Sequence, residues 1–281
     1  MKILLTGREG QVGSELQRSL VVLGDVVATN RHELDLRDST AIRRTVREAK
    51  PDIIVNAAAY TAVDNAESEP DIAMQVNAIA PGILAEEAKR LGALLVHYST
   101  DYVFDGSKKS PYKEEDAPNP LSVYGRSKLE GERAILASEC RHLIFRTSWV
   151  YSWRGRNFLL TILKAAREKP ELRVVDDQFG APTSSPAVAD ATAHALRVGG
   201  PEGLYHMSAS GRTTWFNFAR AILHKVAIAT PVVPIHSDQY PAKAARPRNS
   251  VLDNTRLKQA FGVSLPDWES QLEQVMGQVL R

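Results

Sequence analysis

Tyr124 and Lys128 lie four residues apart in the run VYGRSK at residues 123–128. In a helix, side chains at positions i and i+4 are neighbours on one face. A free phenol has a pKa near 10, so it carries protons slowly at neutral pH unless a nearby cation stabilises the phenolate. The pair is therefore a candidate general acid, Tyr124, with Lys128 as its cation. Because the same spacing also occurs on ordinary solvated helices, other signals must decide between these interpretations.

A second signal lies at the start of the chain, where the apolar run at residues 3–6 leads into GREGQVG at 7–13 and then into a helical pattern. In this context of strand, turn and helix, the glycines let a pyrophosphate approach the N-terminus of the helix. Gly7 and Gly10 suit the tight turn, and Gly13 suits close packing of helix on strand. The residues expected to contact a dinucleotide here are Gly7, Gly10, Gln11, Val12 and Gly13.

The second strand pattern, at residues 26–29, ends at Asn30 and Arg31. In dinucleotide-binding folds an acidic residue near this place binds the ribose hydroxyls, whereas an arginine accommodates a 2′-phosphate. Arg31 therefore favours NADPH, and NADH stays open as an alternative. Small alanines after the apolar strand at 52–56 would let the cofactor lie close. The further expected cofactor contacts are Asn30, Asp35, Leu36, Ala57, Ala58 and Ala59.

Strand and helix patterns alternate through the first half of the chain, with a long helix expected over 70–91 and strands over 93–98 and 142–151. This alternation predicts an α/β fold, a Rossmann-like doubly wound parallel sheet. In such sheets ligands lie beyond the carboxyl ends of the strands, which is where Ser99, Thr100 and Tyr102 fall. His97 lies within its strand and is interpreted as a structural residue.

The regular alternation loosens beyond residue 151. We expect residues 1–151, with a return segment at about 186–207, to form the dinucleotide-binding domain. Residues 152–185 and 208–281 would then form a smaller C-terminal α+β lobe that binds the substrate.

Composition narrows the class of protein. The 281 residues carry 35 basic and 33 acidic side chains, a balance that gives no indication of nucleic acid or a membrane surface as partner. The single cysteine, Cys140, fits a reducing compartment. No stretch approaches the ~20 apolar residues that a membrane-spanning helix needs. We therefore expect a cytoplasmic protein.

Several runs closely resemble the dTDP-4-dehydrorhamnose reductase family, which belongs to the extended short-chain dehydrogenases/reductases. These runs are NAAAYTAVD (56–64), HYSTDYVF (97–104), VYG (123–125), FRTSWVY (145–151), DQFGAPT (177–183) and RPRNS (246–250). The resemblance spans essentially the whole chain. It implies reduction of the 4-keto group of dTDP-4-dehydro-L-rhamnose by a nicotinamide cofactor, the last step of dTDP-L-rhamnose synthesis.

The resemblance also implies roles for individual residues. Tyr124 would protonate the developing alkoxide, Thr100 would donate a hydrogen bond to the same oxygen, and Lys128 would hold the nicotinamide ribose while lowering the pKa of Tyr124. Four residues would line the sugar pocket, and an arginine and an asparagine would contact the nucleotide diphosphate. These substrate contacts are Thr61, Val63, Tyr102, Trp149, Arg246 and Asn249.

Some members of the family form a dimer bridged by magnesium between two glutamates. Glu15 matches the first glutamate, but Pro186 stands at the second position and offers a metal no side-chain ligand. We therefore expect no magnesium bridge, and monomer and homodimer both stay open.

Two alternative functions stay open beside the reductase. One is a catalytically silent NADP-binding regulatory subunit, against which the intact Thr100, Tyr124 and Lys128 argue. The other is a different nucleotide-sugar reductase or epimerase. Asp101 is followed by Tyr102, as in the reductases, whereas dehydratases carry an added acid–base pair at this place.

Overall fold

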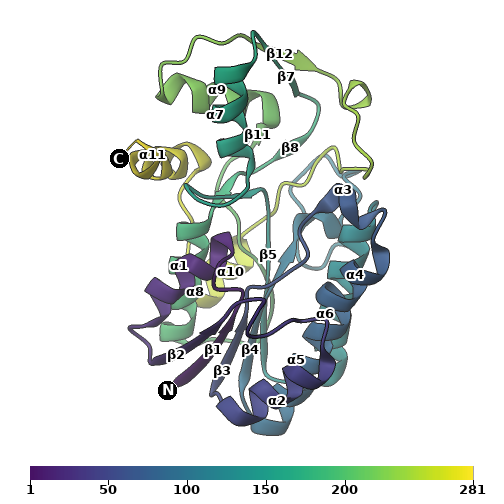
Figure 1. Cartoon of the computed structure of the whole chain (residues 1–281), viewed down its shortest axis with the longest axis vertical. Helices are drawn as coiled ribbons and strands as arrows, with labels where there is room; N and C mark the ends of the chain where they lie inside the picture. Colours follow the sequence, from purple (N-terminus) through teal and green to yellow (C-terminus); the bar gives the residue numbers. More distant parts are fainter. Residues whose placement is uncertain (281) are drawn as a thin grey trace.

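A computed structural model of the chain describes residues 1–280, and its centre is a six-stranded parallel sheet (Figure 1). In their order across the sheet, the strands are β10 (Gly203–His206), β5 (His142–Thr147), β4 (Leu94–Thr100), β3 (Ile53–Asn56), β1 (Lys2–Thr6) and β2 (Asp25–Thr29). The chain winds from β1 outward to β2, then returns past β1 to β3 and continues the other way. The predicted Rossmann-like, doubly wound fold is confirmed.

Helices cover both faces of this sheet. The helices on the two faces are α1 (Gln11–Leu20), α8 (Ser185–Val198) and α10 (Thr255–Phe261) on one side, and α2 (Ser39–Ala49), α5 (Ala80–Leu91) and α6 (Val123–Ser138) on the other. Because successive side chains of a strand point to opposite faces, Ile3 and Leu5 pack with α1 while Leu4 packs with α2. Strands buried on both faces explain the continuous apolar runs in the sequence.

The single helix expected over residues 70–91 is interrupted. Its parts are α4 (Pro70–Met74), one π-helical turn (Gln75–Ile79) and α5, and a short helix α3 (Val63–Ala66) precedes them. Within the π-helical turn, the buried Asn77 accepts a hydrogen bond from the backbone N–H of Tyr60 and donates to the hydroxyl of Ser127. A hydrophobic pattern does not reveal the extra residue of such a turn. Through Asn77, the turn links the segment around Tyr60 to α6.

The expectation of a single strand over residues 142–151 is wrong. Strand β5 ends at Thr147, and the short strand β6 (Val150–Tyr151) pairs instead with β9 (Thr183–Ser184) outside the main sheet. Trp149, between them, has φ of 47°, in the left-handed region that turns the chain away from its strand. The chain therefore leaves the main sheet after Thr147, four residues before the expected strand ends.

A second, smaller group of elements lies beyond the carboxyl ends of the strands, at the top of Figure 1. These elements are α7 (Phe158–Glu168), β7 (Leu172–Val175), β8 (Phe179–Gly180), β11 (Thr213–Thr214), α9 (Trp215–Lys225), β12 (Val232–Ile235) and α11 (Trp268–Val279). They share a core of their own around Phe218, Leu159 and Leu272. The proposed domain boundaries stay a prediction. Helix α10 lies in the segment assigned to the C-terminal lobe, but its Leu257 and Phe261 pack into the core of the main sheet.

Among residues 1–280, no helix combines the length and the apolar character that crossing a membrane requires.

Candidate active site

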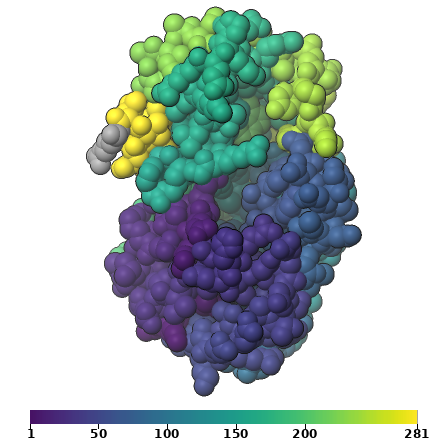
Figure 2. All heavy atoms as spheres, in the orientation of Figure 1, coloured from purple at the N-terminus to yellow at the C-terminus, as the bar shows by residue number. Residues whose placement is uncertain are grey.

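A cavity of about 930 Å³ lies where the main sheet meets the second group of elements. Figure 2 shows the surface hollowed between the purple-to-blue N-terminal part and the teal-to-green part above it. Most of the residues predicted from the sequence line this one cavity. They are Gly7, Gly10, Gln11, Val12, Asn30, Arg31, Asp35, Leu36, Ala57, Ala58, Ala59, Thr61, Val63, Thr100, Tyr102, Tyr124, Lys128 and Trp149.

The glycine turn is built for close approach to a ligand. Gly7 has φ of 74°, and a Cβ there would lie 2.8 Å from the backbone nitrogen of Ala58. Gly13 lies outside the cavity wall, where a Cβ would meet the carbonyl oxygen of Gly7 at 2.1 Å, so α1 packs directly on the turn. Helix α1 begins after Gly10 with no side-chain cap, which leaves its first N–H groups available to an anion. The turn therefore fits the diphosphate of a dinucleotide.

Two arginines line the end of the cavity beyond β2, and they differ in their partners. Arg37 forms an ion pair with Asp35, with 2.5 Å between Nη2 and Oδ2, and this hydrogen bond lowers the pKa of Asp35. Arg31 is exposed and has no ion pair within residues 1–280. Arg31 is thus the cation available to a 2′-phosphate, although this contact stays a prediction.

Tyr124 lies in the first turn of α6, which Ser122 caps by accepting a hydrogen bond from the N–H of Gly125. The ring of Tyr124 meets the ring of Tyr102 edge-on, with centroids 5.9 Å apart. Burial raises the pKa of Tyr124 to about 12, and a hydrogen bond with Thr100 acts in the opposite direction. The protonated phenol that a general acid requires is therefore the stable form at neutral pH.

Lys128 is buried, and its Nζ lies 3.2 Å from Nε2 of His97. Burial lowers the pKa of Lys128 to about 8, against the attraction of Glu132. The expected lowering of the Tyr124 pKa by Lys128 is not found here, because burial dominates the pKa of this phenol and the opposing hydrogen bond comes from Thr100. His97 does lie in the strand interior, as predicted, but it also contacts a residue of the expected catalytic group.

Asp101 is a member of this group that the sequence did not single out. Its carboxyl is buried beside Thr100, whose hydroxyl donates to Asp101 Oδ1 over 3.1 Å, while Oδ2 has no partner within residues 1–280. Burial raises the pKa of Asp101 to about 7. A carboxyl that changes charge near neutrality therefore lines the same cavity. Its position directly after the strand-end Thr100 was the only available signal.

The wall toward the second group of elements contains Trp149 and Trp215. Trp215, at the start of α9, was missed because an aromatic residue in a helical pattern indicates core packing. A Cβ on Gly180 would lie 2.4 Å from the ring of Trp149, so the FGAP run at 179–182 needs its glycine to seat this indole.

Arg246 and Asn249 do not line the cavity in the structure. Arg246 forms an ion pair with Asp64, with 2.7 Å between Nη2 and Oδ2. Asn249 donates from its amide to the carbonyl oxygens of Lys108 and Ser110. Their expected contact with a diphosphate stays a prediction.

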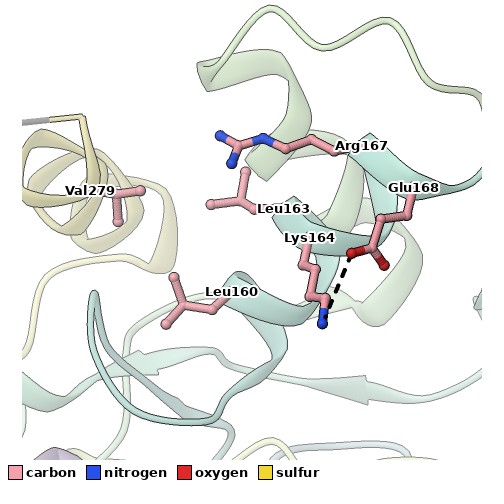
Figure 3. Close-up of a pocket in the computed structure, with 6 residues that line it drawn as sticks. All are labelled: Leu160, Leu163, Lys164, Arg167, Glu168 and Val279. Carbon is pink, nitrogen blue, oxygen red and sulfur yellow. Dashed lines mark ion pairs between the residues drawn. The ribbon is translucent and has the colours of Figure 1, made fainter.

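A smaller hollow of about 370 Å³ lies between α7 and α11. Figure 3 shows Leu160, Leu163 and Val279 around it, with the exposed ion pair of Lys164 and Glu168 at its rim. None of the predicted site residues lines this hollow.

Within residues 1–280, no group of three or more His, Cys, Asp or Glu side chains is arranged to hold a metal ion. Glu15 is buried, with Oε2 3.7 Å from Nε of Arg18, and Pro186 lies in the first turn of α8. The expectation that no magnesium bridge forms, and the open choice between monomer and homodimer, stay predictions.

Reductases of the short-chain dehydrogenase/reductase class share this combination of a Rossmann-like sheet, a glycine turn and a Tyr–Lys pair facing one cavity. The chain falls in that class. Residues 1–281 match the model of the family described as RmlD substrate binding domain, and the chain belongs to this family.

Similar proteins carry a consistent name. A protein of Burkholderia thailandensis named dTDP-4-dehydrorhamnose reductase is 52% identical over 284 residues, covering 95% of each chain. The crystal structure of a dTDP-4-dehydrorhamnose reductase of Clostridium acetobutylicum superposes with a TM-score of 0.96, at 37% identity over 100% of both chains. That of Bacillus anthracis, in complex with NADP, gives a TM-score of 0.94 at 34% identity over 99% of both chains. The family resemblance expected from the sequence is confirmed.

Proposed function

We propose that this protein reduces the 4-keto group of dTDP-4-dehydro-L-rhamnose to give dTDP-L-rhamnose, the last step in the synthesis of that nucleotide sugar. The observation that carries the proposal is the convergence of Thr100, Tyr124 and Lys128 with the glycine turn on one cavity. The name shared by its relatives, and the NADP bound to one of them, support the choice of substrate and cofactor.

The side chains have distinct tasks in this reaction. Bound NADPH supplies the hydride. As negative charge develops on the former keto oxygen, Thr100 donates a hydrogen bond to it and Tyr124 transfers its phenolic proton. Lys128 lies four residues from Tyr124 on the same face of α6, and it supplies a positive charge to the cavity that both residues line.

The substrate and its surroundings follow from the same proposal. Thr61, Val63, Tyr102 and Trp149 would form the pocket for the sugar, and the partner is a nucleotide sugar rather than a nucleic acid. The enzyme would act in the cytoplasm, as a monomer or a homodimer.

The experiment is NADPH oxidation followed by absorbance, with dTDP-4-dehydro-L-rhamnose generated in place from dTDP-glucose by the two preceding enzymes. We expect consumption of NADPH that requires both this protein and the ketosugar, with dTDP-L-rhamnose as product. Tight NADPH binding without any consumption would overturn the reductase in favour of a silent regulatory subunit. Turnover of a different ketosugar alone would overturn the substrate.

A further inference from the structure

Three polar side chains form a row across the carboxyl end of the main sheet. Thr6 of β1, Asn56 of β3 and His97 of β4 are directly opposite one another in the strand register. Each is 1% exposed. Thr6 Oγ1 lies 2.6 Å from Asn56 Oδ1, and Asn56 Nδ2 lies 3.1 Å from His97 Nδ1. The row ends at His97 Nε2, which lies 3.2 Å from Nζ of Lys128.

The chemistry of these groups sets the direction of the hydrogen bonds. An ammonium has only donors, so Nε2 of His97 must accept from Lys128, and the imidazole must be neutral with its proton on Nδ1. That proton needs an acceptor, which only the amide oxygen of Asn56 can be. We therefore assign the Asn56 amide in the reverse of the placement given above, with its oxygen toward Nδ1 of His97 and its NH₂ toward the hydroxyl of Thr6, because the hydrogen-bonding network decides between the two amide orientations.

We propose that His97, oriented by Asn56 and Thr6, is a positioning residue that holds Lys128 in place as an ammonium. This inference rests on the proposed function, because it concerns the same reaction. A neutral acceptor suits this task, since it satisfies one N–H of the ammonium without competing for its charge. The two remaining N–H groups of Lys128 stay available to the contents of the cavity, which Lys128 lines.

The charge of Lys128 depends on few neighbours. From α6 it faces Glu132, and from β4 it faces His97. Glu132 is itself paired with Arg146 of β5 at 2.6 Å, and Asp101 acts on Tyr124 rather than on Lys128. Burial already lowers the pKa of Lys128 to about 8. Loss of the His97 acceptor would leave a buried donor unpaired and lower that pKa further.

The test compares His97→Leu, which removes the acceptor, with His97→Gln, which offers one through its amide oxygen. The first measurement is the dissociation constant of NADPH from pH 6 to 9, by fluorescence without ketosugar; the second is the pH dependence of kcat. For His97→Leu we expect the loss of NADPH binding and of kcat at high pH, which is the alkaline limb of each profile, to occur about one pH unit lower. We also expect NADPH binding to weaken roughly tenfold at pH 8.5 and much less at pH 6.5. His97→Gln should return the alkaline limb most of the way to its wild-type pH.

A matched control is His206→Leu. His206 is a buried histidine on β10 of the same sheet, and its Nδ1 lies 3.1 Å from the carbonyl oxygen of Tyr112 rather than near Lys128. It should lower stability without moving the alkaline limb. An unchanged limb in His97→Leu, or an equal movement in His206→Leu, would overturn the proposal.

A measurement on the unmutated protein covers the case in which His97→Leu does not fold. The nitrogen chemical shifts of labelled histidine, with the His97 signals assigned through His97→Gln, report the proton position. We expect a neutral ring protonated on Nδ1 from pH 6 to 9, and a ring protonated on Nε2 or on both nitrogens would overturn the proposal. NADPH binding and these shifts need no ketosugar, so failure of the proposed function would leave this test intact.

Discussion

The indole of Trp149 lies flat on the indole of Trp215, with ring centroids 3.5 Å apart and planes 6° from parallel. Trp149 comes from the left-handed turn after β5, and Trp215 opens α9, so the stack joins the main sheet to the second group of elements. Phe158 packs against Trp215 with centroids 4.6 Å apart. The stack therefore fixes a flat apolar wall at the end of the cavity where the substrate is expected.

Replacing Trp215 by alanine should weaken substrate binding while sparing the cofactor. An aromatic pair contributes roughly 0.5–1.5 kcal/mol beyond its buried area, so the KM for the ketosugar should rise about two- to tenfold. The dissociation constant of NADPH should stay within about twofold. Trp153→Ala is the control, because Trp153 stacks under Arg154 and does not line the cavity. Equal KM values for Trp215→Ala and wild type would remove the wall from substrate binding.

Tyr124→Phe should abolish most turnover while leaving NADPH bound. A positioned general acid contributes roughly 10²–10⁴-fold, so kcat should fall by that factor. Steady-state kinetics measure this, together with NADPH affinity by fluorescence. Tyr60→Phe is the control, since its phenol also lines the cavity but donates to Glu69. Its kcat should change only a few-fold, and near wild-type turnover in Tyr124→Phe would exclude Tyr124 as the acid.

Arg31→Ala should weaken NADPH more than NADH. Loss of charge-assisted hydrogen bonds to the 2′-phosphate should raise the dissociation constant of NADPH by roughly 10- to 100-fold. The matched control is Arg37→Ala, which removes a neighbouring arginine already paired with Asp35 and should discriminate less between the two cofactors. Equal losses for both cofactors in Arg31→Ala would show that it does not bind the phosphate.

Asp101 should make stability depend on pH between about 4 and 7. Burial raises its pKa from 3.8 to about 7, so in this window the folded protein keeps a proton that the unfolded chain has released. Rising pH therefore destabilises the folded state there by a few kcal/mol, and the slope ends above about pH 7. The free energy of unfolding of wild type minus that of Asp101→Asn isolates this effect. A difference that stays constant across the window would contradict it.

Arg146→Met should strongly destabilise the fold. Arg146 and Glu132 are 3% and 2% exposed, and Arg146 bonds both carboxylate oxygens at 2.6 and 2.8 Å. Removing one partner leaves a buried charge uncompensated, which costs about 3–5 kcal/mol in urea unfolding. The comparison is the exposed pair of Arg133 and Glu130 on α6, the helix that also carries Glu132. Arg133→Ala should change the free energy of unfolding by less than about 1 kcal/mol. Similar losses for both variants would show that burial does not govern the pair.

The sequence alone was enough to predict the doubly wound sheet, the glycine turn and the cavity residues on the first strands. The physical reason is that these features are local. Strands buried on both faces need continuous apolar runs, and a tight turn before a helix needs glycine at Gly7 and Gly10. The Tyr124–Lys128 pair is equally local, because both residues belong to one helix. The family resemblance then indicated the chemistry that we propose for these residues.

Only the tertiary structure decided what these residues meet across the sheet and between the two groups of elements. His97 contacts Lys128 because β4 and α6 pack together, although 31 residues separate them in the chain. Trp215 reaches Trp149 because a left-handed turn takes the chain out of β5, which an apolar pattern does not reveal. The raised pKa of Asp101 likewise follows from burial that several distant segments create together. Periodicity records which face of an element is apolar, whereas contacts between elements depend on how their faces are brought together.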